Sequence, residues 1–352
     1  MKTLQSIGLL LALTISSITT VIAKPDREMF RMDYEIEIGN VTLKGIESVT
    51  VESSVDALVD TCTITLPGMI RNKAYQIEDK IKRGDKVAVK LGYDGNLSTE
   101  FVGYLRAIYP NTPMKLEFED AIFLTRKDIK DKTFAKTNVV EILQYVVDEL
   151  NKQLSPNQQF KVVTDMKGLQ FDKFTILRAN GFQVLDKLKQ ETGLAIYAKE
   201  NELHCHLKYT EKTGSVTYDF TRNLEESSDL QYVKKEDTKV LVKVIGRTKK
   251  GANIEVEVGE KGGDVRTFQR PTISDKASLE TIAKEELKHL SYDGYKGSVK
   301  GWLLPICATG YTAKVIDPDY KEREGSYYVN AVKTEFSASG GRRTVTLGVK
   351  VS

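Results

Sequence analysis

The chain has 352 residues, more than one hydrophobic core normally supports, so about two or three compact units are expected. Lys and Arg number 52 against 49 Asp and Glu, and a formal charge of +3 shows no electrostatic footprint for nucleic acid or an anionic membrane. Cys62, Cys205 and Cys307 lie far apart with no CxxC spacing, so they indicate neither a disulfide framework nor a zinc finger.

The first 28 residues resemble a secretory signal peptide. A basic start, the apolar run of residues 7–13 and the small residues before Lys24 would suit export and cleavage. The apolar run is too short and too interrupted for a membrane span. Two other interpretations stay open: translation that begins at Met29 or Met32, and an extended N-terminal arm.

Residues 29–125 form the first predicted domain. Apolar and polar residues alternate in short runs, with turn residues such as Pro67-Gly68 between them. This period of two predicts antiparallel strands in a sandwich or barrel. The runs are Tyr34 to Ile38, Cys62 to Leu66, Val87 to Leu91 and Leu116 to Phe118.

Residues 126–214 change to a helical pattern and predict a small α/β domain. Asn138 and Glu141 have capping-box spacing before an apolar helical face that extends to Leu150. A second helix is expected after Asn180 and should end at Gly193. A hairpin follows in residues 194–207, turning at residues 199–201.

Residues 215–352 return to strand patterns and predict a second β domain. Strands are expected at Val240 to Ile245 and at Ile254 to Val258. One inserted helix is predicted from about Asp275 to Leu290. The predicted fold class is therefore mainly β with α+β character, with two barrel-like domains on either side of a small α/β domain.

The segment ELHCHL raises the question of a metal site. On a strand, His204 and His206 point to one face and Cys205 to the other, so the three cannot converge on one ion. The remaining histidine is the distant His289, and no motif nearby supplies an acidic third ligand. The pattern predicts a plain strand in a half-buried hairpin and no metal site.

Two other motifs are interpreted as turns. The glycine-rich Gly259–Gly263 lacks the ending of a phosphate-binding loop and predicts a hairpin turn. Asp317 and Asp319, followed by Glu322 and Glu324, lack calcium-loop spacing and predict a solvated turn. No motif of a catalytic nucleophile occurs, although a carboxylate pair among the acidic residues remains possible. No catalytic residue, metal ligand or cofactor is predicted.

Two distant segments repeat one pattern. Residues 86–120 and residues 311–351 each contain a strand, a polar turn, a long strand, a second turn and a third strand of similar lengths. Residue identity is slight, and three-stranded meanders are common. The repeat suggests two similar β domains.

Several segments resemble phage tail hub proteins of the late-control D family. The run Gly325–Ser337, followed by Gly340–Gly348, resembles the C-terminal strands of that family. Further similar segments are Asp60–Pro67, Phe101–Arg106 and Gly181–Leu207. The family includes the baseplate hub of contractile tails and the hub module of type VI secretion valine-glycine repeat spike proteins.

The resemblance implies a structural protein without a cofactor. It implies a homotrimer with two barrels per subunit that lines a channel and joins a hexameric tail tube to a trimeric central spike. Implied partners are the tail tube or distal tail protein, the spike, and the tape-measure and baseplate wedge proteins, without sequence-specific nucleic acid binding. The implied location is the virion tail, assembled in the host cytoplasm.

Alternatives remain open at this stage. An exported β-rich binding protein or hydrolase would agree with the signal-like N-terminus. A phage tail, a bacteriocin and a secretion machine are not distinguished, nor are contractile and non-contractile tails.

The long C-terminal strand contains the predicted interface residues. Alternation would place Tyr327, Val329 and Ala331 on one face and Tyr328, Asn330 and Val332 on the other. Both faces are largely apolar, which indicates a strand covered on both sides. Tyr328, Asn330 and Val332 are therefore expected to contact a neighbouring domain or subunit, although the opposite assignment of faces is possible.

Overall fold

The computed structural model describes residues 30–70, 73–74, 77, 79–166, 169–225, 229–237, 239–248, 252–271 and 273–351. The signal-like segment, residues 1–28, lies outside the described residues. No helix in the described part of the chain is long and apolar enough to cross a membrane.

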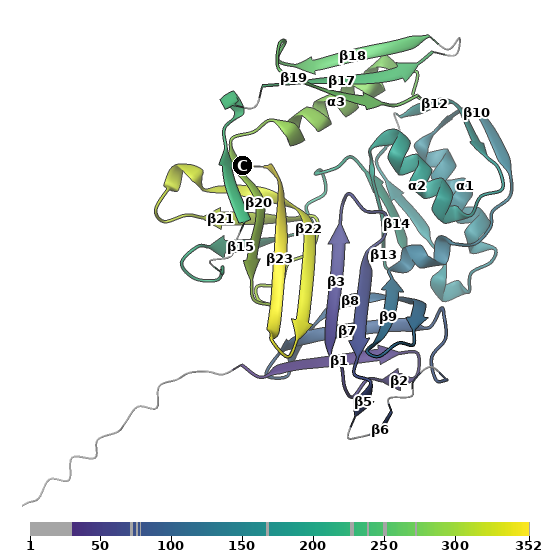
Figure 1. The fold of residues 1–352 in the computed structure, drawn as a ribbon. Coiled ribbons are helices and arrows are strands. Elements are labelled where there is room, and N and C mark those ends of the chain that lie inside the picture. Colours follow the sequence, from purple (N-terminus) through teal and green to yellow (C-terminus); the bar gives the residue numbers. More distant parts are fainter. Residues whose placement is uncertain are drawn as a thin grey trace, which may run out of the picture. The chain divides into compact units, whose positions relative to one another are not determined.

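The first barrel-like domain is antiparallel (Figure 1). Its strands follow the order β3 (Ser48–Ser54), β4 (Thr61–Leu66), β9 (Met114–Glu119), β8 (Asn96–Tyr109), β7 (Lys86–Tyr93) and β1 (Met32–Ile38). The short β2 (Val41–Thr42) pairs with β1, and β5 (Met69–Ile70) pairs with β6 (Lys73–Ala74). The alternating runs predicted from the sequence are confirmed as strands, and their apolar residues, such as Ile36, Ile64 and Val89, form the core.

The middle domain contains two helices and two small sheets. Its elements are η1 (Ala121–Thr125), β10 (Lys132–Asn138), α1 (Val139–Asn151), η2 (Pro156–Gln158), β11 (Lys161–Thr164), β12 (Gln170–Ile176), α2 (Gly181–Thr192), β13 (Ala195–Lys199) and β14 (Glu202–His206). The predicted helix ends are confirmed. Asn138 accepts a hydrogen bond from the Glu141 amide at 3.0 Å, Asn180 and Gln183 form a capping box, and Gly193 ends α2 with φ of 73°.

The second barrel-like domain uses strands from the last third of the chain. Its order is β16 (Asp229–Val233), β20 (Gly294–Gly301), β23 (Gly340–Lys350), β22 (Gly325–Ser337), β21 (Tyr311–Ile316) and β15 (Gly214–Asp219), with η4 (Lys321–Arg323) between β21 and β22. Val216, Val299, Val315 and Val345 lie in its core.

An inserted layer interrupts the second barrel between β16 and β20. It contains η3 (Lys235–Asp237), β17 (Val240–Arg247), β18 (Asn253–Gly259), β19 (Asp264–Gln269) and α3 (Lys276–Leu290). The predicted strands and helix are confirmed. However, their buried residues, such as Val242, Val244 and Leu279, join the core of the middle domain rather than the barrel core. Periodicity identifies a buried face but not the partner that covers it.

The glycine-rich turn is not a hairpin. β18 and β19 lie on opposite sides of β17, so residues 260–263 cross the start of β17. A Cβ atom at Gly259, where φ is 122°, would lie 2.3 Å from the carbonyl oxygen of Val240. The glycine is needed because two backbone segments approach closely there.

The two barrels match strand for strand. The order β3-β4-β9-β8-β7-β1 in the first corresponds to β16-β20-β23-β22-β21-β15 in the second. All neighbouring pairs are antiparallel except β15 with β21, which is parallel where β1 with β7 is antiparallel. The repeat seen in the sequence is therefore a repeat of topology.

A bulge fixes the correspondence at single residues. The pairing of β8 with β9 shifts register between Leu105 and Ala107, and that of β22 with β23 shifts between Val329 and Ala331. The residue before each bulge accepts a hydrogen bond from a glycine: Gly84 N to Leu105 O at 2.8 Å, and Gly310 N to Val329 O at 3.1 Å. The segment YLRAI in β8 thus corresponds to YVNAV in β22.

Candidate functional site

The junction between the two barrels is a direct strand pairing. The second half of β22 pairs antiparallel with β3, from Ala331 opposite Ser54 to Ser337 opposite Ser48 (Figure 1). The first half of β22 pairs with β21 instead. One 13-stranded sheet therefore passes through both barrels.

A buried ion pair reinforces this junction. Arg343 on β23 is 2% exposed, and its Nη2 lies 2.5 Å from Oε1 of Glu100 on β8. Its Nη1 donates to the carbonyl oxygens of Leu303, at 2.5 Å, and Pro305, at 2.9 Å. The bridge joins a strand of the first barrel to a strand of the second, and protein partners surround the guanidinium.

Tyr328 and Asn330 contact the loop that follows β3. Tyr328 packs against Val55 and Val349, and Asn330 Nδ2 donates to Oδ2 of Asp56 at 2.9 Å. The Val55 amide donates to the carbonyl oxygen of Asn330 at 3.0 Å. Both predicted interface residues thus lie where the second barrel meets the first. Their part in a subunit interface remains a prediction.

The face predicted for Val332 is wrong. Val332 packs in the second-barrel core together with Tyr327 and Val329, rather than on the face of Tyr328. The register shift between Val329 and Ala331 adds one residue to β22, which moves the following side chains to the other face. Strict alternation cannot reveal such a bulge.

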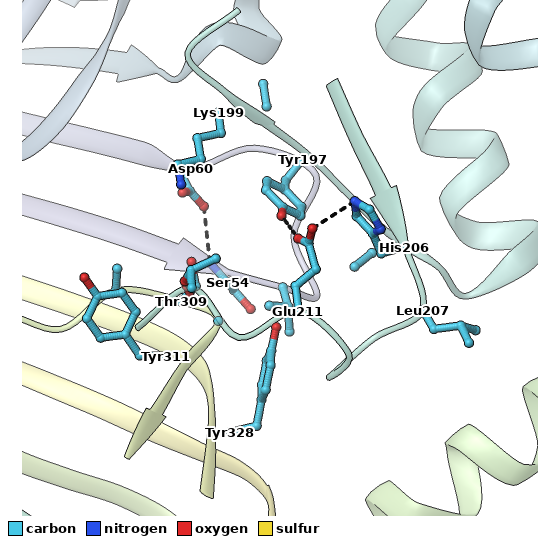
Figure 2. A pocket seen from close by; sticks show the side chains of 16 residues that line it. Ser54, Asp60, Tyr197, Lys199, His206, Leu207, Glu211, Thr309, Tyr311 and Tyr328 are labelled. Atoms are coloured by element: carbon cyan, nitrogen blue, oxygen red, sulfur yellow. Dashed lines mark hydrogen bonds and ion pairs between the residues drawn. The ribbon is translucent and has the colours of Figure 1, made fainter. Parts of the chain in front are cut away.

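A cavity of about 330 Å³ lies beside the junction (Figure 2). It is lined by residues of both barrels and the middle domain, including Asp60, Tyr197, His206, Glu211 and Tyr328. Figure 2 shows the carboxylate of Glu211 between the Tyr197 hydroxyl and the His206 ring.

Asp60 lines the cavity, and the buried Asp120 lies beside it. The Asp60 amide donates to Oδ2 of Asp120 at 3.1 Å, and Oδ1 of Asp60 accepts from the Ser54 amide at 3.2 Å. Burial raises the pKa of Asp60 to about 7, against the backbone hydrogen bond from Ser54 and the nearby Lys189. The pKa of Asp120 is also raised by burial and by the adjacent Asp60.

The histidine strand is more buried than the sequence predicts. β14 is central, because β11 pairs with it on one side and β13 on the other. His204 and His206 are 8% and 7% exposed, and Cys205 on the opposite face is 0% exposed. The expectation that no acidic group accompanies the histidines is wrong, since Glu211 lies beside both rings. Only its position five residues after His206 could have indicated it.

The predicted turn after β21 is only partly solvated. Pro318 and Asp319 are exposed, but Asp317 is 6% exposed. Its carboxylate accepts from the Tyr295 hydroxyl and from the amides of Asp319, at 3.2 Å, and Tyr320, at 3.1 Å. Asp317 therefore closes the turn from inside.

All three cysteines are free and buried. Burial raises the pKa of Cys205 to about 12 and that of Cys307 to about 11, and it raises the pKa of Cys62 further. Their thiols are protonated at neutral pH, which is unsuited to a nucleophile.

Comparison with known proteins identifies the fold through structure alone. No protein-family model and no curated protein matches the chain. The 43 kDa tail protein of prophage MuSo2 from Shewanella oneidensis matches with a TM-score of 0.63 and 12% identity, over 90% of this chain and 98% of that chain. A tail protein from Neisseria meningitidis MC58 matches with a TM-score of 0.61 and 13% identity, over 90% and 96%.

A third match comes from a secretion system. The E. coli c3393 protein, described as a type VI secretion component structurally similar to T4 tail proteins gp27 and gp5, matches with a TM-score of 0.55 and 10% identity. The match covers 90% of this chain and 77% of that chain. The chain therefore has the fold of phage tail proteins and of a type VI secretion component related to them in structure.

Proposed function

We propose that the protein is a structural tail hub that, as a homotrimer, joins a hexameric tail tube to a trimeric central spike and lines the channel. The fold supports a tail role, because the matched structures are tail proteins and a secretion component. The observation that supports the trimer is the repeat of the barrel. Within one chain, β22 of the second barrel pairs with β3 of the first, and each of these two strands has a counterpart in the other barrel.

The two counterpart strands, β16 and the end of β8, each have one edge without a strand partner in the described residues. β16 corresponds to β3, and β8 corresponds to β22. In the part of the chain that the structure describes, β16 pairs only with β20, and the end of β8 from Ala107 to Tyr109 pairs only with β9. Free edges of this kind are templates for pairing with another chain.

The register of the missing pair follows from the matched barrels. Cross-strand partners lead from Leu105 through Phe118 and Cys62 to Val51 in one barrel, and from Val329 through Leu347 and Gly297 to Leu230 in the other. Leu230 in β16 therefore corresponds to Val51 in β3.

We infer that β16 of one subunit pairs antiparallel with the end of β8 in the next. Tyr109 then lies opposite Gln231 of a second copy, and Ile108 lies opposite its Tyr232. Within one chain, the pair that corresponds to Tyr109 and Gln231 is Lys333 and Glu52, whose side chains form an ion pair at 3.7 Å. Three copies joined this way would alternate six similar barrels, which suits both sixfold and threefold partners.

A cysteine pair tests this interface. The full chain with Tyr109→Cys and Gln231→Cys should form a covalent trimer on mild oxidation, because cysteines opposite each other on paired strands are within disulfide range. Each single variant should remain one chain on a denaturing gel. A double variant with Tyr109→Cys and Asp229→Cys, two residues out of register, should cross-link much less. Equal cross-linking of both pairs, or none, contradicts the inferred register.

Light scattering tests the oligomer itself. The purified chain, or its complex with the cognate spike, should have the mass of a trimer. A chain that remains monomeric with its spike would contradict the hub function.

The alternative is an exported binding protein or hydrolase, and the signal-like N-terminus favours it. Mass spectrometry of the mature N-terminus from the native source separates the two. Cleavage before Lys24 would favour export, whereas a start at Met29 or Met32, or a retained segment, agrees with a hub.

A further inference from the structure

We propose that His204, His206 and Glu211 bind one divalent transition-metal cation, with Zn²⁺ the ion best suited to two imidazoles and a carboxylate. One ligand atom from each residue lies within 4.8 Å of the others. The site is independent of the proposed hub function, because all its ligands come from one chain.

The distances between the ligand atoms match such a site. Oε1 of Glu211 lies 3.7 Å from His204 Nδ1 and 3.0 Å from His206 Nε2. Ligand atoms about 2.1 Å from a tetrahedral zinc lie about 3.4 Å from one another. The two distances from Glu211 bracket that value, and the two imidazole nitrogens, which lie within 4.8 Å of each other, complete the set around an ion.

Each imidazole has one inner nitrogen, which faces Glu211, and one outer nitrogen, which faces another carboxylate. The proton on the outer nitrogen determines whether the inner nitrogen can bind a metal ion. His204 Nε2 lies 3.1 Å from Glu202 Oε2, and His206 Nδ1 lies 3.1 Å from Asp165 Oδ1. A carboxylate holds the ring proton on the nitrogen next to it, which leaves the opposite nitrogen as a lone pair. Carboxylate-bound histidines of this kind are typical of zinc ligands.

The inner nitrogens lack a proton-donating partner. His204 Nδ1 and His206 Nε2 are both buried and make no hydrogen bond among the described residues. With the outer nitrogens protonated, two lone pairs and one carboxylate oxygen face each other in a buried space. Three acceptors repel one another unless a cation lies between them.

Neighbouring groups hold the third ligand in place. The Tyr197 hydroxyl donates to Oε2 of Glu211, which directs Oε1 toward His206 (Figure 2). The Tyr197 ring also stacks on His204 with centroids 4.9 Å apart. The adjacent cavity, which His206 and Glu211 line, has room for water as a fourth ligand.

The position of Glu211 suggests what the ion does. Both histidines lie on β14 in the middle domain, whereas Glu211 lies in the connection from β14 to β15 of the second barrel. A bound ion would fasten this connection to the sheet of the middle domain.

Metal titration of the full chain tests the site. After treatment with chelator, the chain should bind one equivalent of Zn²⁺ by calorimetry, and Co²⁺ should produce the visible absorption of a four-coordinate site. Glu211→Gln keeps the shape of the side chain and an acceptor for Tyr197, but it should lower Zn²⁺ affinity by about 100-fold or more. Asp165→Asn, which removes only an outer partner, should lower it by about 10- to 100-fold.

His289→Gln is the matched control, because His289 lies on α3 outside the cluster, and its Zn²⁺ affinity should equal that of the wild type. Circular dichroism of the metal-free variants checks that they are folded, and the Co²⁺ spectrum of the wild type needs no variant. Absence of binding to the wild type would overturn the proposal. Binding that Glu211→Gln leaves unchanged, or that His289→Gln weakens equally, would also overturn it.

Discussion

Arg343 is the largest fully buried side chain in the described residues. Its charge is balanced by one carboxylate, that of Glu100, and by backbone carbonyl groups. Removing one partner of a buried pair leaves an uncompensated charge, which costs more than the pair contributes. The junction therefore depends on both residues together.

We expect Glu100→Ala to lower the free energy of unfolding by about 3–5 kcal/mol, because Arg343 then remains buried and unpaired. The double variant Glu100→Leu with Arg343→Met should recover part of that loss. Glu52→Ala breaks an exposed ion pair with Lys333 at the same junction and should cost at most about 1 kcal/mol. Denaturant unfolding measures all three, and a double variant less stable than Glu100→Ala would contradict this account.

Asp60 makes stability depend on pH. Its pKa rises from 3.8 in the unfolded chain to about 7 in the folded protein because the carboxyl group is buried. Between these values the folded state holds a proton that the unfolded state has released. The free energy of unfolding therefore falls as pH rises from about 4 to about 7.

Asp60→Asn should remove this loss, since the amide oxygen can still accept from the Ser54 amide. The variant should gain on the wild type by on the order of 2 kcal/mol between pH 5 and pH 8, a value discounted for water in the cavity. Melting curves at both pH values measure the gain. The exposed Asp319→Asn variant controls for the lost charge, and a gain equal to that of Asp60→Asn would refute the assignment.

At the scale of the element, the bulge in β22 decides which side chains enter the core. Val329 and Val332 both pack in the second barrel, whereas Tyr328 packs against Val55 outside it. Tyr328 also lines the cavity, where a charge can be hydrated. The same charged substitution should therefore act differently at these positions.

Val329→Asp and Val332→Asp should each unfold the second barrel, because each buries a carboxylate in an apolar core at a cost above about 4 kcal/mol. Tyr328→Asp should leave the barrel folded and weaken only its contact with the first barrel. Thermal melts and amide hydrogen exchange of β23 distinguish these results. If Val332→Asp instead behaves like Tyr328→Asp, the bulge does not place Val332 in the core.

At the scale of the whole molecule, local signals predicted the elements well. Alternation located β1, β4, β7 and β9, and capping-box spacing at Asn138 located the start of α1. The other two predicted helices begin directly after Asn180 and Asp275, which the structure shows to be their N-caps. These signals act within a few residues, where propensity and hydrogen bonding determine the backbone. The repeated meander was also visible, because strand order and turn lengths survive changes of residue.

Contacts between distant segments could not be predicted in this way. The bulges at Arg106 and Asn330 have no residue signature of their own. Glu211 reaches the histidines because the chain turns back after β14. The inserted layer packs on the middle domain through contacts between residues far apart in the sequence. Each result depends on long-range packing, which a pattern of period two or 3.6 does not contain.

The two free edges, β16 and the end of β8, differ from each other, so the pairing proposed between subunits would run head to tail. A head-to-tail contact produces a closed ring only when the turn from one copy to the next brings the last edge back to the first; otherwise it produces an open fibre. Part of that rotation between copies is determined within each chain, by the angle at which β3 meets β22. A substitution at this junction that leaves both barrels folded but alters the angle would therefore replace rings with filaments, a defect that electron microscopy would show and melting curves would miss.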